Sequence, residues 1–528
     1  MRELIERKPV VKFSWISSEA VIQLEFPVHE QLTDSVLQKG LDAVVRDGIT
    51  SQIKMTLTES IFLIAFAVAL GASNAVIGLI AAIPPLAQLL QIPSIILVQK
   101  TKIRRRICVV SSAFSRLSIL FMVFIPVLSP GVSGLLLLLI GVTSHAVFNA
   151  MSVAAWNSWM KDLIPQEILG RFFSKRLAVQ ALVGIITTLS AGILIDQWLQ
   201  SDPTTLNPYS VVFFIGMIAG MVGVYFIYTI PEPRMIIETL DQSFTNTLRS
   251  PFHNDDFRRL MMFSASWSFA VTLAGPFFTV YLLEVLGYDL SIVTGLSVLT
   301  QVTSMLFYQW WGKLSDKYSN KTVLSVTTPV YVIGILLWIF TTVPGTHIFT
   351  LPLLLLIHVI LGLSVAAVNL SHGNLALKLA PRGESTSYLA GWSIVNSIAA
   401  VLAPLFGGII ADTLTDSFLS FHLAWQGLGV SFDLGLIDIR GLDFVFLISF
   451  LVGLYAIHRL AMVREAGEAD QKTIIDAMVA QAGRGLRNLS TVDGLRHSIV
   501  APLANALRSA RNQSTPVETN QDEEENQE

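Results

Sequence analysis

The chain has 528 residues, of which 52% are hydrophobic and only 14% are charged, and its net charge is −3. Soluble domains carry about 25% charged residues, so this composition excludes an ordinary soluble protein of the same length. The one cysteine, Cys108, excludes an intrachain disulfide framework and a CxxC metal site. A mean hydropathy of +0.61 instead indicates that a lipid bilayer is the solvent for most of the chain.

Apolar runs of about 18–25 residues recur along the sequence, and each is long enough to cross a hydrocarbon core of about 30 Å. Helices are expected because backbone polar groups in lipid must be satisfied within the segment, and the runs are too long for barrel strands. The sequence therefore predicts an all-α polytopic membrane protein with twelve transmembrane helices. In chain order the predicted spans are 51–71, 75–98, 107–128, 132–159, 177–198, 209–230, 259–286, 290–312, 322–343, 349–376, 386–411 and 442–462.

Basic residues gather in the loops on one side of these spans. On the opposite side the loops carry a single basic residue, Arg440, among several aspartates. Because Lys and Arg are enriched in cytoplasmic loops, we expect both termini to be cytoplasmic. The expected location is the cytoplasmic (inner) membrane of a bacterium. The basic loop residues are Lys100, Lys102, Arg104, Arg105, Arg106, Lys161, Arg171, Lys175, Arg176, Arg234, Arg249, Arg258, Arg259, Lys313, Lys317, Lys321, Lys378 and Arg382.

The sequence repeats itself at an interval of about 216 residues. Leu163-Ile164-Pro165 returns as Leu379-Ala380-Pro381, and 381 − 165 = 216. The segment 191–196 (AGILID) returns at the same interval as 407–412 (GGIIAD). Each half then holds six spans, and an even number of spans makes the two repeats parallel, related by an axis along the membrane normal. We predict six-helix halves at 51–230 and 258–462, joined by a cytoplasmic linker at 231–257.

Three segments lie outside the predicted bundle. Residues 1–50 are predicted as a cytoplasmic N-terminal segment, with apolar residues at helical spacing between Leu32 and Val45. Residues 463–528 are predicted as a cytoplasmic helix followed by a disordered acidic tail from about 511. The loop at about 412–441 is predicted to form a short external hairpin. We interpret the three segments as accessory packing elements, with a regulatory role as the alternative.

The loop after the eighth span, residues 312–321 (GKLSDKYSNK), carries the most specific motif, and this motif resembles the loop motif of the major facilitator superfamily. Gly312, Asp316, Lys317 and Lys321 match that family's loop pattern, while Ser319 and Asn320 replace its usual glycine and basic residue. The equivalent first-half loop keeps Lys100 and Arg104 but has Ile95 and Gln99 where glycine and aspartate would stand. The resemblance covers about residues 50–465. It implies a gate formed by these loops and a central cavity lined by spans 1, 4, 7 and 10.

Ionisable residues inside a membrane are costly and are functional candidates for that reason. Glu59 lies about 12 Å deep in the first span and Arg116 about 14 Å deep in the third, at a rise of 1.5 Å per residue. Their similar depths make an ion pair between them geometrically possible. In one interpretation Glu59 of this pair exchanges a proton during transport, and in the other the pair is permanently structural. Lys54 is expected to extend to the cytoplasmic interface.

Polar and aromatic residues in the predicted spans are the candidates for solute binding. In the fourth span His145, Asn149 and Trp156 share one helical face, and in the tenth His358 and Asn369 do the same. Such residues bind solutes or hydrogen-bond neighbouring helices, and both interpretations stay open. The remaining candidates, from spans 7, 8 and 11, are Trp267, Gln301, Trp392 and Asn396.

These features predict a secondary active transporter that moves a small neutral or amphipathic organic solute by alternating access, with proton coupling as one option. One alternative is efflux of hydrophobic compounds of the multidrug type. Another is a non-transporting membrane scaffold or sensor on the same fold. The sequence has no Walker A motif, nucleophile–base pair or metal-ligand cluster, so we expect no enzyme, cofactor or metal. The expected partners are the solute, protons and lipid, with no nucleic acid and a monomer as the default state.

Overall fold

The computed structural model describes residues 28–29, 33–129, 131–235, 250–342, 348–381, 385–427 and 430–465. Twelve helical segments of this described part are long and apolar enough to cross a membrane, which confirms the twelve predicted spans. The predicted C-terminal helix and acidic tail, from residue 466 onward, lie outside the described residues.

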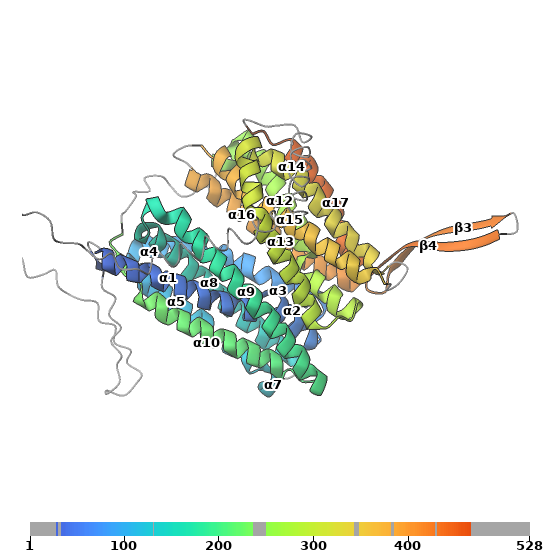
Figure 1. The fold of residues 1–528 in the computed structure, drawn as a ribbon, viewed down its shortest axis with the longest axis horizontal. Helices are drawn as coiled ribbons and strands as arrows, with labels where there is room; N and C mark the ends of the chain where they lie inside the picture. The colour runs from blue at the N-terminus through green and yellow to red at the C-terminus, as the bar shows by residue number, and fades with distance from the viewer. Residues whose placement is uncertain are drawn as a thin grey trace, which may run out of the picture.

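The N-terminal half contains the first six spans (Figure 1). Several of them are divided into consecutive helices, and the linker after the sixth span adds a two-residue strand, β2 (Glu232–Pro233), which pairs in parallel with β1 (Val28–His29). The helices are α1 (Asp34–Thr58), α2 (Ser60–Ala69), α3 (Asn74–Gln88), α4 (Gln91–Thr101), α5 (Arg104–Leu117), α6 (Ile119–Val123), α7 (Ile125–Leu128), α8 (Val132–Leu163), α9 (Gln166–Ser201) and α10 (Asn207–Thr229).

The C-terminal half contains the other six spans and one hairpin (Figure 1). Strands β3 (Phe418–Gly427) and β4 (Val430–Arg440) pair antiparallel, which confirms the hairpin predicted at about 412–441. The helices are α12 (Asp255–Val280), continued by a π-helical turn (Tyr281–Val285), α13 (Leu290–Tyr318), α14 (Asn320–Leu336), continued by a 3₁₀ turn (Leu337–Thr342), α15 (Thr350–Leu379), α16 (Ser385–Thr413) and α17 (Asp443–Ala461).

The first spanning helix is longer than the predicted span. The span was expected at 51–71, but α1 begins at Asp34 and includes most of the amphipathic stretch. Two apolar residues of that stretch, Leu41 and Val44, are buried inside the N-terminal half, in the same cluster as Trp159 and Ile227, while Leu37 is half-buried against that cluster. Burial of this apolar face explains why the helix continues, since a packed apolar face stabilises a helix more than local propensity does.

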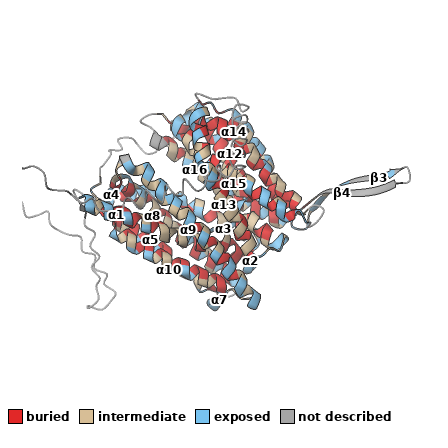
Figure 2. Ribbon diagram, in the orientation of Figure 1, coloured by how far each residue is buried: buried red, intermediate tan, exposed pale blue. Residues whose placement is uncertain are grey.

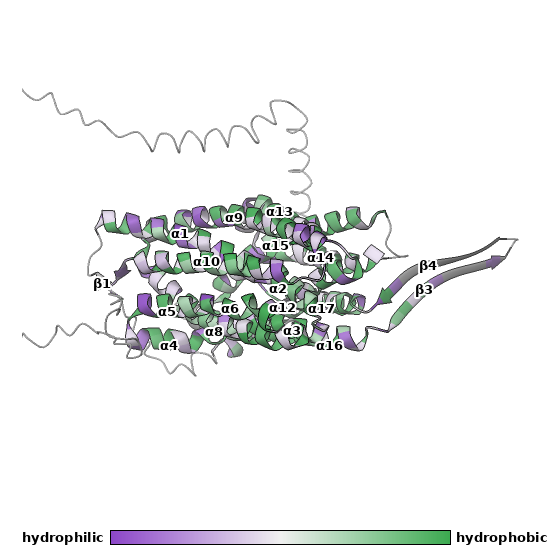
Figure 3. Cartoon of the chain, turned by 90° about the horizontal axis from the view of Figure 1, so that it is seen from below, coloured by the Kyte–Doolittle hydropathy of each residue, from purple (hydrophilic) through white to green (hydrophobic). Residues whose placement is uncertain are grey.

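The exposed surface of the bundle is apolar. Leu136, Leu177 and Leu306 are each at least 60% exposed, and many other large apolar side chains are also exposed. Figure 2 shows exposed residues along the outer faces of the helices, and Figure 3 shows hydrophobic residues gathered in the middle of the bundle. A water-soluble protein rarely exposes so much contiguous apolar surface, so this surface is one that faces lipid.

The bundle has two ends, and their contacts differ. We call the end where α1 begins and α17 finishes the basic end, and the end that carries β3 and β4 the hairpin end. At the basic end, Glu232 accepts the backbone N–H of Arg104 at 2.9 Å, and the Arg104 side chain pairs with Asp162. In the other half, Glu465 accepts the backbone N–H of Lys321 at 2.7 Å. Each glutamate therefore caps the third spanning helix of its own half.

Candidate functional site

The first spanning helix is interrupted at Glu59, which follows the 25 residues of α1 and precedes the 10 residues of α2 in the segment Asp34–Ala69. Glu59 has an extended backbone with φ −129° and ψ 176°, and Ser60 adopts a left-handed conformation with φ 55°. A residue other than glycine in this region is strained by about 1–2 kcal/mol, and such strain is concentrated at functional sites. Irregular backbone at membrane depth is tolerated where it lines a cavity. The break therefore marks a candidate site.

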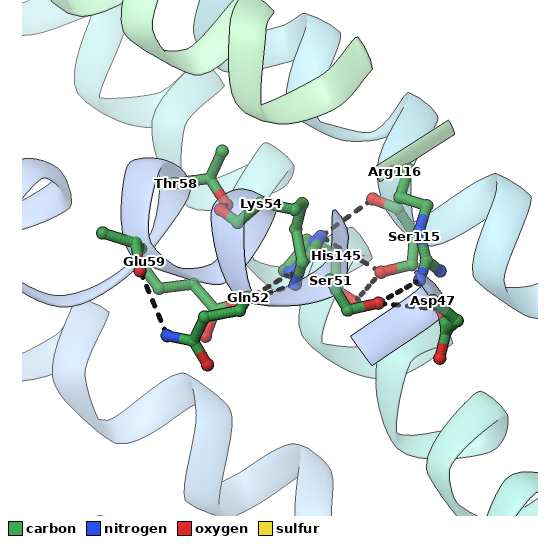
Figure 4. A network of polar contacts seen from close by, with 10 residues as sticks. Asp47, Ser51, Gln52, Lys54, Thr58, Glu59, Ser115, Arg116 and His145 are labelled. Carbon is green, nitrogen blue, oxygen red and sulfur yellow. Dashed lines mark hydrogen bonds and ion pairs between the residues drawn. The ribbon is translucent and has the colours of Figure 1, made fainter. Parts of the chain in front are cut away.

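The Glu59 carboxylate is held by two neighbours (Figure 4). Its Oε1 accepts a hydrogen bond from Lys54 Nζ at 2.7 Å and lies 3.2 Å from His145 Nε2. Lys54 Nζ also lies 3.4 Å from His145 Nε2. The Lys54 side chain is only 7% exposed, so the expectation that it extends to the interface is wrong. Lys54 instead neutralises a carboxylate inside the bundle.

His145 is oriented by the third span. Ser115 Oγ lies 3.1 Å from His145 Nδ1, and the same hydroxyl donates to the His145 carbonyl at 3.0 Å. The Nδ1 atom also lies 2.8 Å from the Ser115 carbonyl oxygen. A ring nitrogen facing a carbonyl oxygen carries the hydrogen, which leaves Nε2 of the neutral ring to accept from Lys54 or, after protonation, to donate to Glu59.

Arg116 does not contact Glu59 in this conformation. Its Nη2 lies 3.4 Å from Ser51 Oγ, which in turn donates to Asp47 Oδ1 at 3.0 Å. Asp47 also lies 3.7 Å from Nη2 of Arg176. The expected Glu59–Arg116 pair is thus replaced by two adjacent groups, Lys54–Glu59–His145 and Asp47–Ser51–Arg116 (Figure 4).

Glycines of α10 make room for these buried cations. A Cβ atom at Gly220 would lie 2.9 Å from Cγ of both Arg116 and Lys54, and one at Gly216 would lie 2.7 Å from a methyl group of Thr58. Separations below 3.0 Å are not tolerated by real side chains without movement. Gly216 and Gly220 therefore allow α1 to pack closely on α10, as small residues do between membrane helices.

A cavity of about 560 Å³ opens beside Glu59, between the two halves. Among the predicted site residues, its wall includes Glu59, His145, Asn149 and Gln301. Other polar lining residues were not predicted to bind solute, because single Thr, Ser and Gln residues in apolar runs carry no distinctive signal. These are Gln52, Thr56, Thr58, Ser60, Gln88, Thr188, Thr279 and Ser297.

Two of the other predicted solute-binding residues, Trp156 on α8 and Trp267 on α12, do not line the cavity and pack against other side chains. The ring of Trp156 lies 5.0 Å from the Arg176 guanidinium, a cation–π contact. Trp267 is 5% exposed and packs against Tyr331 with ring centroids 5.3 Å apart.

The remaining candidates make contacts inside the C-terminal half. His358 Nδ1 lies 2.8 Å from the Leu354 carbonyl oxygen, and Asn369 donates to the Tyr308 hydroxyl at 3.4 Å. Trp392 Nε1 donates to Ser264 Oγ at 2.8 Å, and Asn396 accepts from Ser268 through its backbone carbonyl. The His358 contact lies within α15, whereas those of Asn369, Trp392 and Asn396 join helices of the half.

The loop-motif residues are divided between buried and exposed positions. Arg104 is fully buried and Lys321 is 8% exposed, and both belong to the capped helix ends of their own halves. Lys100, Asp316 and Lys317 are exposed, and Gly312 is half-buried. Lys317 lies over the ring of Tyr318 at 4.8 Å. The contacts that the structure shows for this motif thus lie within each half.

The cavity wall offers hydrogen-bonding groups and the carboxylate of Glu59, which pairs with the buried Lys54. Within the part of the chain that the structure describes, no group of three or more His, Cys, Asp or Glu residues could hold a metal ion. The arrangement is suited to binding a small polar or amphipathic molecule, and Glu59 is the acidic residue of the wall, with a side chain that is 36% exposed.

Comparisons with known proteins agree with this architecture. A family model described as Major Facilitator Superfamily matches residues 49–350 and 269–473. A point mutant of the nucleoside transporter NupG superposes with a TM-score of 0.62 at 15% identity, covering 80% of this chain and 100% of that chain. A bacterial homologue of the human lysosomal transporter Spinster, inward-facing and unoccupied, gives 0.60 at 14% identity, covering 82% and 98%.

A D-xylose–proton symporter gives a TM-score of 0.56 at 14% identity, covering 83% of this chain and 99% of that chain. No curated protein sequence matches the chain. The structural likenesses establish the fold alone, whereas the family model covers most of the sequence. Together with the twelve apolar spans and the two six-helix halves, that match shows that the chain is an integral membrane protein that belongs to the major facilitator superfamily.

Proposed function

We propose that this protein is a secondary active transporter that carries a small neutral or amphipathic organic solute by alternating access. The observation that supports this most strongly is the cavity of about 560 Å³ at the break of the first spanning helix, lined by residues of both halves. A site between two rigid repeats opens to one side and then the other when the halves rock. The amides and hydroxyls of the wall suit a solute with several hydrogen-bonding groups.

We propose that Glu59 takes up and releases the coupling proton. The carboxylate is partly exposed, while Lys54 donates to its Oε1 and His145 Nε2 lies 3.2 Å from the same oxygen. Protonation of Glu59 removes the negative charge that pairs with Lys54, so the ammonium needs another acceptor. His145 lies within 3.4 Å of Lys54 Nζ and is positioned to provide that acceptor as a neutral ring. Proton binding and local rearrangement are thereby coupled.

The basic end is assigned to the cytoplasm under this proposal. Most Lys and Arg residues of the loops lie at that end, and the loops of the hairpin end carry aspartates. The positive-inside rule then places both termini in the cytoplasm and the hairpin outside. A bacterial inner membrane is the proposed location.

Flux measurements in reconstituted vesicles test the proposal. Purified protein is incorporated into liposomes, and uptake of candidate solutes is followed with and without a pH gradient. Solutes are chosen by a thermal-shift screen, because a ligand that binds only the folded state raises its melting temperature. Glu59→Gln is expected to abolish the effect of the pH gradient while solute binding persists. Asp42→Asn, at an exposed position of the same helix, is the matched control. An unchanged pH-driven flux in Glu59→Gln would refute the proton role.

Efflux of hydrophobic compounds is the second candidate function. The cavity wall also includes Met55, Phe62, Ile80 and Met122, and flexible or aromatic apolar side chains accommodate varied ligands. The same thermal-shift screen distinguishes the two functions. Stabilisation by many unrelated lipophilic cations or neutral drugs supports efflux, whereas a response to one class of polar metabolite supports selective transport.

A further inference from the structure

An aspartate at the end of α9 reaches across to the other half of the molecule. Asp196 Oδ1 accepts the backbone N–H of Leu290 at 3.0 Å, and its Oδ2 accepts that of Ser291 at 2.6 Å. Leu290 is the first residue of α13. The first N–H groups of a helix have no partner within the helix, and the helix dipole places partial positive charge there. One carboxylate of the N-terminal half thus caps a helix of the C-terminal half.

The converse contact is made by an aspartate at the end of α16. Asp412 Oδ1 accepts the backbone N–H of Asn74 and its Oδ2 that of Ala75, both at 2.9 Å. Asn74 is the first residue of α3. Here a carboxylate of the C-terminal half caps a helix of the N-terminal half. Both contacts lie at the hairpin end, where Figure 1 shows the two halves converging.

The two contacts are related by the internal repeat. Asp196 and Asp412 are 216 residues apart, and so are the capped residues Leu290 and Asn74. One turn before each aspartate stands a glycine at the crossing of the same two helices. A Cβ atom at Gly192 would lie 2.4 Å from Thr294 Oγ1, and one at Gly408 would lie 2.3 Å from the Asn74 carbonyl oxygen. The repeat therefore preserves a unit of close glycine contact and aspartate cap.

These caps differ from those of the basic end, where Glu232 and Glu465 cap helices of their own halves. A cap within a half is unaffected when the halves move as rigid bodies, whereas a cap between halves must break. Release at the hairpin end is energetically feasible because helix ends lie near water, which can solvate the freed carboxylate and N–H groups. Hydrogen bonds to a charged group nevertheless contribute more than neutral ones.

We propose that Asp196 and Asp412 form an aspartate latch that holds the hairpin end closed, and that both caps must release before the cavity opens to that side. The latch shifts the equilibrium between conformations that are closed and open at the hairpin end. Its place in a transport cycle rests on the proposed function, but its existence does not, so it is tested without a solute.

Distances between paired spin labels measure the state of each end. Cys108 is fully buried and is replaced by serine, which removes the one native thiol. Ser201→Cys with Ile348→Cys reports on the hairpin end, and Thr101→Cys with Lys313→Cys reports on the basic end; all four positions are exposed. The full-length protein is labelled in lipid nanodiscs and compared with Asp196→Ala, Asp412→Ala and the double variant.

Each single substitution is expected to raise the ratio of open to closed hairpin ends about tenfold, and the double variant to raise it further. The basic-end distances should shorten as the hairpin-end distances lengthen. Asp202→Ala and Asp416→Ala are matched controls, since both aspartates are exposed at the same end a few residues from the latch, and they should leave both distances unchanged.

Asp196→Asn and Asp412→Asn provide the conservative variants if an alanine variant fails to fold. Each keeps one acceptor oxygen but places an amide NH₂ against the second backbone N–H, so an intermediate shift is expected. Hairpin-end distances that match those of the Asp202 and Asp416 controls, in latch variants that elute as folded protein, would overturn the proposal.

Discussion

The two halves share one fold but differ in what they bury at their centres. In the N-terminal half, Asp47, Lys54 and Arg116 are all at most 6% exposed and lie inside the first and third spans. In the described part of the C-terminal half, the buried Asp, Glu, Lys and Arg residues are Lys321, Asp443 and Glu465, which lie at helix ends. The internal repeat thus preserves helix packing and the aspartate caps at the hairpin end, but it does not preserve the buried charges at the centre.

The centre of the C-terminal half uses neutral contacts instead. Ser264 receives a hydrogen bond from Trp392 Nε1 and lies 2.6 Å from His372 Nε2, and Trp267 packs on Tyr331. Removing the partner of a charge in a low-dielectric interior strongly lowers the free energy of unfolding, whereas each neutral hydrogen bond contributes only about 1 kcal/mol to it. The comparison therefore predicts that substitutions in the N-terminal half have larger effects and depend on charge.

The largest effect is expected for Lys54→Met. This change leaves the Glu59 carboxylate with His145 as its remaining ion-pair neighbour among the described residues. Removing one partner of a buried pair costs about 3–5 kcal/mol, and we expect about 3 kcal/mol because Glu59 is 36% exposed. Thermal unfolding in detergent measures the loss as a lower melting temperature, and vesicle flux should fall with it.

A double variant separates charge from shape. Lys54→Met combined with Glu59→Gln removes both charges, so most of the lost stability should return, while Lys54→Arg should retain it. If the double variant is as unstable as the sum of the single variants, the ion pair does not explain the effect, and the contrast between the two halves fails at its strongest point.

The twelve spans and the repeat could be predicted from the sequence. The length of a span, its apolar composition and the interval of the repeat are properties of long segments, so they do not depend on any single residue. The contacts of Lys54 were not predictable from the predicted span. With a helix starting near residue 51, Lys54 would lie at the interface. Because α1 begins at Asp34, Lys54 instead lies about 30 Å along the helix, at a rise of 1.5 Å per residue.

The helix break at Glu59 gave no local signal either. The residues around it, Leu57 to Ile61, include no glycine or proline that would mark an interruption. The break accompanies contacts that Glu59 makes with a residue five positions earlier and with His145 on α8. Tertiary contacts of this kind override helix propensity, so single-sequence reasoning identified Glu59 as a candidate and missed its partners.

The second largest effect is expected for Gly220→Val, which tests the packing beside the charged centre. A Cβ atom there would lie 2.9 Å from the side chains of both Arg116 and Lys54, and overpacking costs about 2 kcal/mol. The melting temperature measures the change. Gly295→Val is the control in a helix of the C-terminal half, where nothing lies within 4 Å of the added Cβ atom. Equal losses at both positions would show that helix glycines matter without regard to the charged centre.

A smaller effect is expected for Glu465→Gln at the basic end of the C-terminal half. Burial alone raises the pKa of Glu465, but hydrogen bonds from the Lys321 backbone, Asn320 and Lys378 outweigh it and lower the pKa overall. A carboxyl with a lowered folded-state pKa stabilises the fold above its unfolded pKa of about 4.3 and ceases to do so as the pH falls further.

The loss in Glu465→Gln should therefore be about 1.5 kcal/mol at pH 7 and should shrink below about pH 4. Melting temperatures of the wild type and the variant across this pH range measure it. A difference that stays constant down to pH 3 would assign the effect to side-chain shape and not to charge.

The smallest effect is expected for Trp392→Phe, which tests the neutral centre of the C-terminal half. The change removes the donor to Ser264 Oγ while keeping an aromatic ring, and Ser264 retains its contact with His372. The loss of one neutral hydrogen bond costs about 1 kcal/mol. Because no ionised group takes part in the Trp392–Ser264 bond, the change in melting temperature should be the same at pH 6 and pH 8.

Ser264→Ala removes the shared oxygen and is expected to cost more, since both Trp392 and His372 then lose a partner. A strong pH dependence in Trp392→Phe would mean that the C-terminal centre carries charge during the cycle, and the proposed division of roles between the halves would have to be abandoned.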